Sequence, residues 1–148
     1  MSRADVTSKI LNTKTAKGIK WRDVAAKLGL SKEWVTAACL GQMTLSESQA
    51  ALVGEIFGLT AEEQQWLTVV PYKGSLPTNV PTDPLIYRFY ELVQVYGTTW
   101  KELIQEEFGD GIMSAIDFSM DMKRQPDPKG DRVAITMSGK FLPYKRFQ

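Results

Sequence analysis

The sequence predicts an α+β protein made of two parts, a helical bundle over residues 1–75 and a small α+β part over residues 76–148. In the first part apolar residues recur at helical spacing, whereas near the C-terminus they recur at every second residue, as in a half-buried strand. Between these patterns lies "YKGSLPTNVPTDP", whose prolines favour a loop. The change of period across this loop predicts two domains of different class.

Five short helices account for the first part, and their ends carry suitable capping residues. Gly18 and Gly41 are suited to end two of them, and Ser31 is suited to begin another. Thr60, followed three residues later by Glu63, forms a capping-box pattern at the start of the last helix. The expected helices lie, in chain order, within "SRADVTSKILNTKTAKG", "KWRDVAAKLGL", "SKEWVTAACLG", "TLSESQAALVGEIFGLT" and "TAEEQQWLTVVP".

Within this bundle, "DVAAKLGLSKEWVTAACLG" resembles the helix-turn-helix of phage-repressor-like regulators. Ala25 occupies the small-residue position of the first helix, Gly29 the turn, and Val35 the packing position of the second. The second helix offers only the opposed charges of Lys32 and Glu33 where base edges would be read. Residues 1–75 hold nine Lys and Arg against seven Asp and Glu, too even a balance for a surface that follows phosphates. We expect a structural or oligomerising role and no DNA binding; a transcriptional regulator is the alternative.

The second part begins with two expected helices. Asp83 is suited to cap the first, which we expect to end at Gly97. Thr99 and Glu102 form the capping box of the next helix, "TWKELIQEEF", which we expect to stop at Gly109.

Beyond "GDG", apolar and polar residues alternate, which predicts a strand. The side chains expected on its apolar face are those of Ser114, Ile116, Phe118, Met120 and Met122. "RQPDPKGD" indicates a loop and "RVAITM" a second strand, after which Ser138 and Gly139 are expected to turn the chain into "KFLPYKRF". An isolated hairpin of this size is marginal in water. We therefore expect a second subunit to complete the sheet, with the C-terminal half holding a homo-oligomer together.

A candidate site lies in this C-terminal half. Arg88 and Glu91 are one helical turn apart, and flanking aromatic residues favour a helix buried on most sides, where an arginine binds anions strongly. Ser114 is expected to face inward, where its hydroxyl needs a partner. If that face is the subunit interface, Ser114 of one chain would meet Arg88 of another. The alternatives are a solvated ion pair and an ordinary edge serine, which would leave a non-catalytic oligomeric scaffold.

The residue types that are absent narrow the chemistry. The chain contains no histidine and a single cysteine, Cys39. An internal disulfide, a Ser-His-Asp or Cys-His site within the chain and a zinc site of the usual ligands are therefore excluded. Any reaction must use arginine, lysine, carboxylates, hydroxyls or groups of the substrate itself. We expect neither a metal nor a cofactor.

Charge and hydropathy point to a cytoplasmic protein. Lys and Arg total 18 against 17 Asp and Glu, so the net charge of +1 predicts no strong attraction to nucleic acid or anionic membranes. No apolar run is long enough to span a membrane, and the N-terminus lacks the apolar core of a signal peptide. A lone cysteine fits a reducing compartment.

Two long strings stand out in the second half, "PTDPxxYRFYExxQVYGTTxKxxxxExFGDGIxSAIxF" and the closing "GKFLPYKRF". Together they resemble the cyanase (cyanate hydratase) family. The resemblance extends over essentially the whole chain, including the helix-turn-helix-like bundle, and is densest from Pro81 to Phe118. Some family members carry a histidine near the position of Gln105, so its absence here implies that the chemistry does not require it.

The resemblance implies a site and a reaction. In that family the catalytic residues are the arginine and glutamate of "YRFYE" and the serine of "GDGIxSAI", which are Arg88, Glu91 and Ser114 here. The implied activity is a bicarbonate-dependent decomposition of cyanate to carbamate and carbon dioxide, after which carbamate gives ammonia and carbon dioxide. Bicarbonate would be a co-substrate, and small dianions such as oxalate would inhibit. A homodecamer, a pentamer of dimers with active sites between subunits, is also implied.

Overall fold

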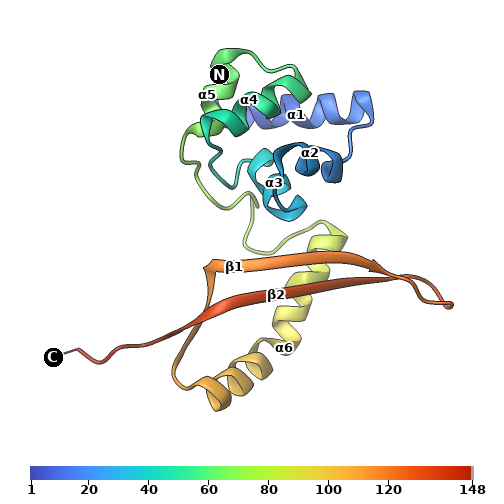
Figure 1. Ribbon diagram of the computed structural model, residues 1–148. Coiled ribbons are helices and arrows are strands. Elements are labelled where there is room, and N and C mark those ends of the chain that lie inside the picture. The colour runs from blue at the N-terminus through green and yellow to red at the C-terminus, as the bar shows by residue number, and fades with distance from the viewer. Residues whose placement is uncertain (148) are drawn as a thin grey trace. The chain divides into compact units, whose positions relative to one another are not determined.

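The structure, a computed structural model, describes residues 1–147 and divides into two compact units, Met1–Ser75 and Leu76–Gln148. The α+β class predicted from the sequence is confirmed: helices make up the first unit, and one helix and a two-stranded antiparallel sheet the second (Figure 1). The elements are α1 (Arg3–Lys17), α2 (Trp21–Leu28), α3 (Lys32–Cys39), α4 (Glu47–Phe57), α5 (Ala61–Thr68), α6 (Pro84–Phe108), β1 (Gly111–Gln125) and β2 (Arg132–Pro143).

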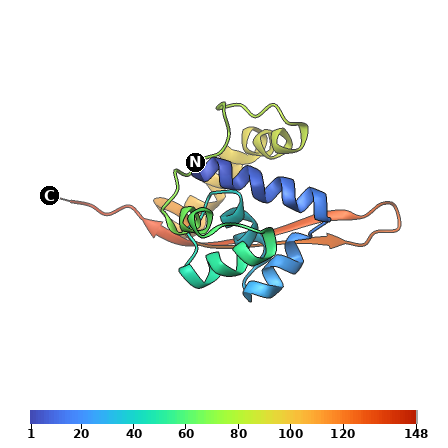
Figure 2. The same ribbon diagram turned by 90° about the horizontal axis from the view of Figure 1, so that it is seen from above.

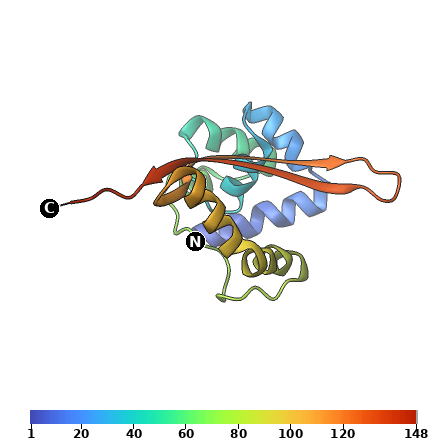
Figure 3. The same cartoon turned by 90° about the horizontal axis from the view of Figure 1, so that it is seen from below.

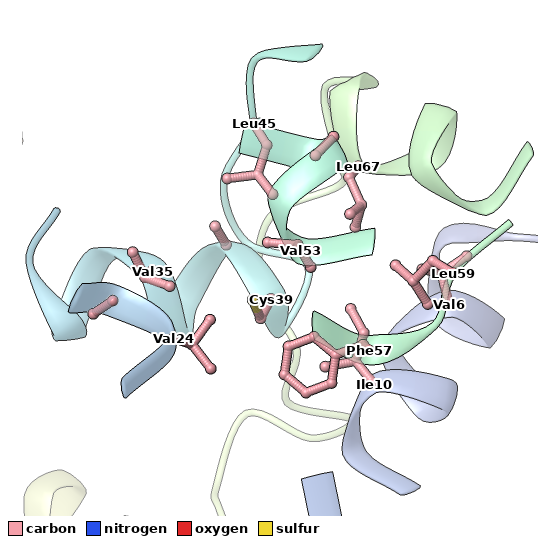
Figure 4. Close-up of a cluster of buried hydrophobic side chains, with 13 residues drawn as sticks. Val6, Ile10, Val24, Val35, Cys39, Leu45, Val53, Phe57, Leu59 and Leu67 are labelled. Atoms are coloured by element: carbon pink, nitrogen blue, oxygen red, sulfur yellow. The ribbon is translucent and has the colours of Figure 1, made fainter. Parts of the chain in front are cut away.

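The helices of the first unit pack around one apolar core. Ile10, Val35 and Leu67 are completely buried, and Phe57 lies beside Ile10 in this cluster (Figure 4). Fully burying each such side chain contributes about 1.5–3 kcal/mol relative to leaving it in water. The first unit therefore has a core of its own, as an independently folding domain requires.

The predicted helix ends of the first unit are confirmed where capping residues specified them. Gly29 has a φ of 68°, the left-handed conformation needed between α2 and α3. At the start of α5 the Thr60 N–H donates to the Glu63 carboxylate at 2.7 Å, and the Glu63 N–H donates to the Thr60 hydroxyl at 3.2 Å. On the surface of α3, Lys32 and Glu33 pair at 2.6 Å, so their charges cancel as predicted.

In the second unit α6 runs without a break, so the predicted helix end at Gly97 and the separate helix from Thr99 are wrong. A glycine inside a helix costs about 1 kcal/mol relative to alanine, which is too little to end a helix with strong signals at both ends. At the start, the Asp83 carboxylate accepts two backbone N–H groups of the first turn, both at 3.0 Å. The predicted stop at Gly109 is confirmed; its N–H closes the last turn onto the Gln105 carbonyl at 2.9 Å.

β1 and β2 form a long, narrow hairpin with the predicted loop at its tip (Figure 2). The predicted turn at Ser138 and Gly139 is wrong, because both residues pair within the ladder, opposite Ser119 and Phe118. Gly139 is needed for space instead: a Cβ at this position would collide with the carbonyl oxygen of Ser114.

The regular pairing of the hairpin is interrupted by a bulge. Met113 pairs with Phe141 and Phe118 pairs with Gly139, so five residue steps on β1 face two on β2. The predicted alternation is therefore wrong where it begins: Ser114 is 4% exposed, whereas Ile116 is 98% exposed. Extra residues in one strand are unpaired and redirect side chains, and bulges of this kind are frequent beside active sites.

The single chain does not bury α6. None of its residues is buried, and an apolar stripe formed by Leu85, Phe89 and Val93 is exposed by 68%, 46% and 56%. The prediction of a helix buried on most sides is wrong for the chain by itself, because two strands have too little surface to cover it.

Among the described helices none is long and apolar enough to cross a membrane.

Candidate active site

Arg88 lies in the first turns of α6, where three groups orient its guanidinium. Its Nε donates to the Pro84 carbonyl at 3.2 Å, and its Nη1 lies 3.3 Å from Oε2 of Glu91. Its Cζ lies 5.3 Å from the ring centroid of Tyr87, a cation–π distance. An exposed ion pair of this kind adds less than about 1 kcal/mol to stability, so these contacts matter for orientation more than for folding.

Ser114 lies inside the bulge, where its own backbone holds its side chain. The Oγ accepts the N–H groups of Ile116 at 3.0 Å and of Asp117 at 2.9 Å. A hydroxyl has two acceptor lone pairs and one donor proton. Because both acceptor positions are occupied, the O–H is left to donate, which suits Ser114 to bind an anion rather than to attack as a nucleophile.

This geometry corrects one detail of the sequence analysis. Alternation alone predicted that Ser114 faces inward; in the structure Ser114 is buried, and its hydroxyl is held in an ST-type turn by the next residues. The N–H groups of Ile116 and Asp117 point at Ser114 and are already bonded. The hydroxyl therefore presents one donor to a ligand, supported from behind by the backbone.

The structure brings together two of the three predicted site residues. Arg88 and Glu91 pair on α6, but among the described residues no hydrogen bond or ion pair joins either of them to Ser114. The end of α6 meets β2 through the stacked rings of Phe108 and Phe141, with centroids 5.1 Å apart. The first turns of α6, by contrast, lie away from β1 and β2 (Figure 3). A site with all three residues therefore needs more than the contacts made within one chain.

Two features near these residues escaped the sequence analysis. The first is the Tyr87 ring beside the guanidinium, for which an aromatic residue next to an arginine was the available signal. The second is a hollow of about 390 Å³ beside the bulge. Its lining residues are Asp117, Phe118, Ser119, Ser138, Gly139 and Lys140. The ring adds a cation–π contact to Arg88, and the hollow carries both an acidic and a basic side chain, Asp117 and Lys140.

Other reactive groups are not arranged for catalysis. Burial raises the pKa of the Cys39 thiol to about 11, against the opposing effect of the Arg3 guanidinium, so this thiol is protonated at neutral pH. Within residues 1–147 no cluster of His, Cys, Asp and Glu side chains is placed to hold a metal ion. Arg88, Glu91 and Ser114 offer one cation, one carboxylate and one hydroxyl donor.

Both units match families of known proteins. Residues 3–71 match the family model described as the N-terminal part of cyanate hydratase, and residues 78–146 match that of the cyanate lyase C-terminal domain. The helical unit and the helix-and-hairpin unit, each matched to its family model, place the chain in a class of lyases. The chain belongs to the cyanate hydratase family, also called cyanate lyase or cyanase.

Relatives and a solved structure agree along the whole chain. A cyanate hydratase of Methylibium petroleiphilum is 76% identical over 147 residues, which are 99% of this chain and 100% of the relative. A cyanate hydratase of Cupriavidus necator is 65% identical over the same shares of the two chains. The crystal structure of cyanase from T. urticae has a TM-score of 0.81 and 38% identity, covering 94% of this chain and 97% of that one. The family resemblance seen in the sequence is thereby confirmed.

Proposed function

We propose that this protein is a cyanate hydratase that uses bicarbonate as its second substrate. Cyanate, bicarbonate and one proton give carbamate and carbon dioxide; carbamate then takes up a second proton and gives ammonia and carbon dioxide. The observation that carries the proposal is a preoriented guanidinium on α6 together with a buried serine whose hydroxyl is left to donate. These groups bind anions, and both substrates are anions.

The protein's task is to hold two anions together. Their mutual repulsion in a desolvated site amounts to several kcal/mol, which fixed donors must offset. Arg88 neutralises and aligns the anions through its fork of N–H groups. Ser114 donates to bicarbonate or to the oxygens of the adduct. Bicarbonate is the nucleophile and carries one of the protons that the cyanate nitrogen gains, so neither a histidine base nor a metal or cofactor is needed.

The complete site forms between subunits in this proposal. The exposed apolar stripe of α6 and the two-stranded sheet are surfaces that further copies of the chain would cover. We assign the C-terminal unit to catalysis and to a decamer of five dimers, and the N-terminal unit to a role without nucleic acid. Small dianions such as oxalate are expected to compete with the paired substrates, and the cytoplasm is the expected location.

The test of the activity is ammonia release from cyanate in degassed buffer, with and without added bicarbonate. Release that depends on bicarbonate supports the proposal, and oxalate should suppress it. No release from a folded, assembled protein would contradict the proposal and favour the scaffold alternative.

A shared site also predicts complementation between two variants of low activity. Arg88→Ala and Ser114→Ala are each expected to lose about 100- to 1,000-fold in activity alone, which leaves a measurable residual activity. In co-assembled mixtures, about a quarter of the sites would combine both native residues, so about a quarter of the wild-type activity should return. Ammonia release from co-expressed, differently tagged chains measures it. No recovery in confirmed mixed oligomers would place both residues in one chain.

Glu91→Gln tests the role of the carboxylate, which we propose locks Arg88 and relays a proton. The amide keeps the shape and removes the charge that pairs with Arg88 at 3.3 Å. We expect kcat/KM to fall by about 10- to 100-fold, with most of the loss in kcat. Asp131→Asn, which removes the carboxylate paired with Arg124 at the hairpin tip, is the control and should be neutral. Full activity of Glu91→Gln would refute both roles.

A further inference from the structure

We propose that Gly139 is a positioning residue for Ser114, because only a residue without a side chain leaves room for the bulge that orients the Ser114 hydroxyl. This inference rests on the proposed function, in which Ser114 donates to the substrate anions. It adds a residue of β2 to a site otherwise built from α6 and β1.

The first observation is where Gly139 lies in the ladder. It pairs with Phe118, the residue at which regular pairing resumes after the bulge. The five residue steps from Met113 to Phe118 are accommodated opposite only two steps of β2. The surplus length of β1 must therefore fold over β2 close to Gly139.

The second observation is the close approach at this point. A Cβ built on Gly139 would collide with the carbonyl oxygen of Ser114 and would lie 2.7 Å from Cγ of Met113. Real Cβ atoms do not come so close to a backbone oxygen, and a backbone atom cannot move aside as a flexible side chain can. Gly139 is not among the glycines with positive φ, so backbone freedom does not explain it. The glycine is instead explained by the space that the Ser114 carbonyl needs at this position.

The consequence is chemical. The Ser114 O–H is restricted to donating a hydrogen bond only while the Oγ accepts the N–H groups of Ile116 and Asp117. A side chain at position 139 would push the Ser114 backbone away from β2 and shift the Oγ relative to those two amides. The hydroxyl would then lose its fixed direction, and a displacement of about 1 Å at a reacting group lowers rates by about 100-fold.

The experiment is a double-mutant cycle of Gly139→Ala and Ser114→Ala. We expect each single variant to lower kcat/KM, by about 10- to 100-fold for Gly139→Ala. In the Ser114→Ala background, Gly139→Ala should cost no more than about twofold further, because there is no hydroxyl left to position. Losses that multiply in the double variant would overturn the proposal.

Hydrogen–deuterium exchange gives a readout that does not depend on activity. The amides of Ile116 and Asp117 should exchange faster in Gly139→Ala, as in Ser114→Ala, than in the wild type. Unchanged exchange at both amides would overturn the positioning role. If wild-type protein shows no bicarbonate-dependent turnover, the proposed function fails, while the exchange result still decides whether Gly139 positions Ser114.

Gly111→Ala is the matched control, since its methyl group would meet the Leu142 carbonyl and the Phe141 ring instead of Ser114. Its effect on kcat/KM should multiply with that of Ser114→Ala; the same non-additivity at both glycines would indicate general hairpin damage and overturn the proposal. If Gly139→Ala alone fails to fold, Met113→Ala is added to it, because this removes the second contact that the new Cβ would meet. The exchange of the Ile116 and Asp117 amides in that double variant is then compared with Met113→Ala alone, and no difference between the two would contradict the proposal.

Discussion

Replacing Arg88 by lysine is expected to lower kcat/KM for cyanate by about 100-fold or more, although the positive charge is kept. Lysine has one ammonium group and no planar fork, so it cannot reproduce two parallel N–H contacts to an anion. It would also lose the arrangement seen here, in which Nε is bonded to Pro84 while Nη1 lies near Glu91. Steady-state ammonia release at saturating bicarbonate measures the loss.

The same chemical change elsewhere in the second unit is the control. Arg124 pairs with Asp131 at 2.9 Å near the hairpin tip, and Arg124→Lys should leave kcat/KM unchanged. Oxalate affinity, measured by calorimetry, should fall in Arg88→Lys and stay constant in Arg124→Lys. Wild-type kcat/KM in Arg88→Lys would refute the role given to the fork of N–H groups.

The parts of the fold that could be predicted from sequence are those fixed by nearby residues. Gly29 and the capping box of Thr60 and Glu63 lie within one turn of the ends that they define, so pattern and structure agree. The helix end predicted at Gly97 was wrong because a single glycine is tolerated inside a helix whose pattern continues on both sides. Helix ends were therefore predicted well where a side chain caps them or where the helical pattern stops at a glycine, as at Gly29 and Gly109, and wrongly at Gly97, where the pattern continues on both sides.

The same distinction applies to the candidate site. The pair of Arg88 and Glu91 follows from spacing along one helix, and the structure places them together. The environment of Ser114 depends on a bulge opposite Gly139, a contact between residues far apart in the chain. Period-two counting assumes an unbroken ladder and cannot detect an insertion in one strand. A glycine at position 139 is compatible with a turn and also with a close approach of two strands, so the sequence alone could not show that it makes room for Ser114.

A lysine at Val93 is expected to break the oligomer and to abolish activity with it. Val93 shares the exposed apolar stripe of α6 with Leu85 and Phe89, the surface that we propose other subunits cover. Burying an unpaired ammonium group there would cost several kcal/mol, so the subunits should separate. Since no hydrogen bond or ion pair joins Arg88 to Ser114 within residues 1–147 of one chain, separated subunits should release no ammonia.

Sedimentation velocity and ammonia release on the same sample measure this prediction. Gln94→Lys is the matched control, because it adds the same charge at the next residue of α6, outside the apolar stripe. It should keep the assembly and most of the activity. If Val93→Lys stayed fully assembled and active, the apolar stripe would not be an interface. If it dissociated and kept its activity, a single chain would hold the complete site, and the shared arrangement of Arg88 and Ser114 would be wrong.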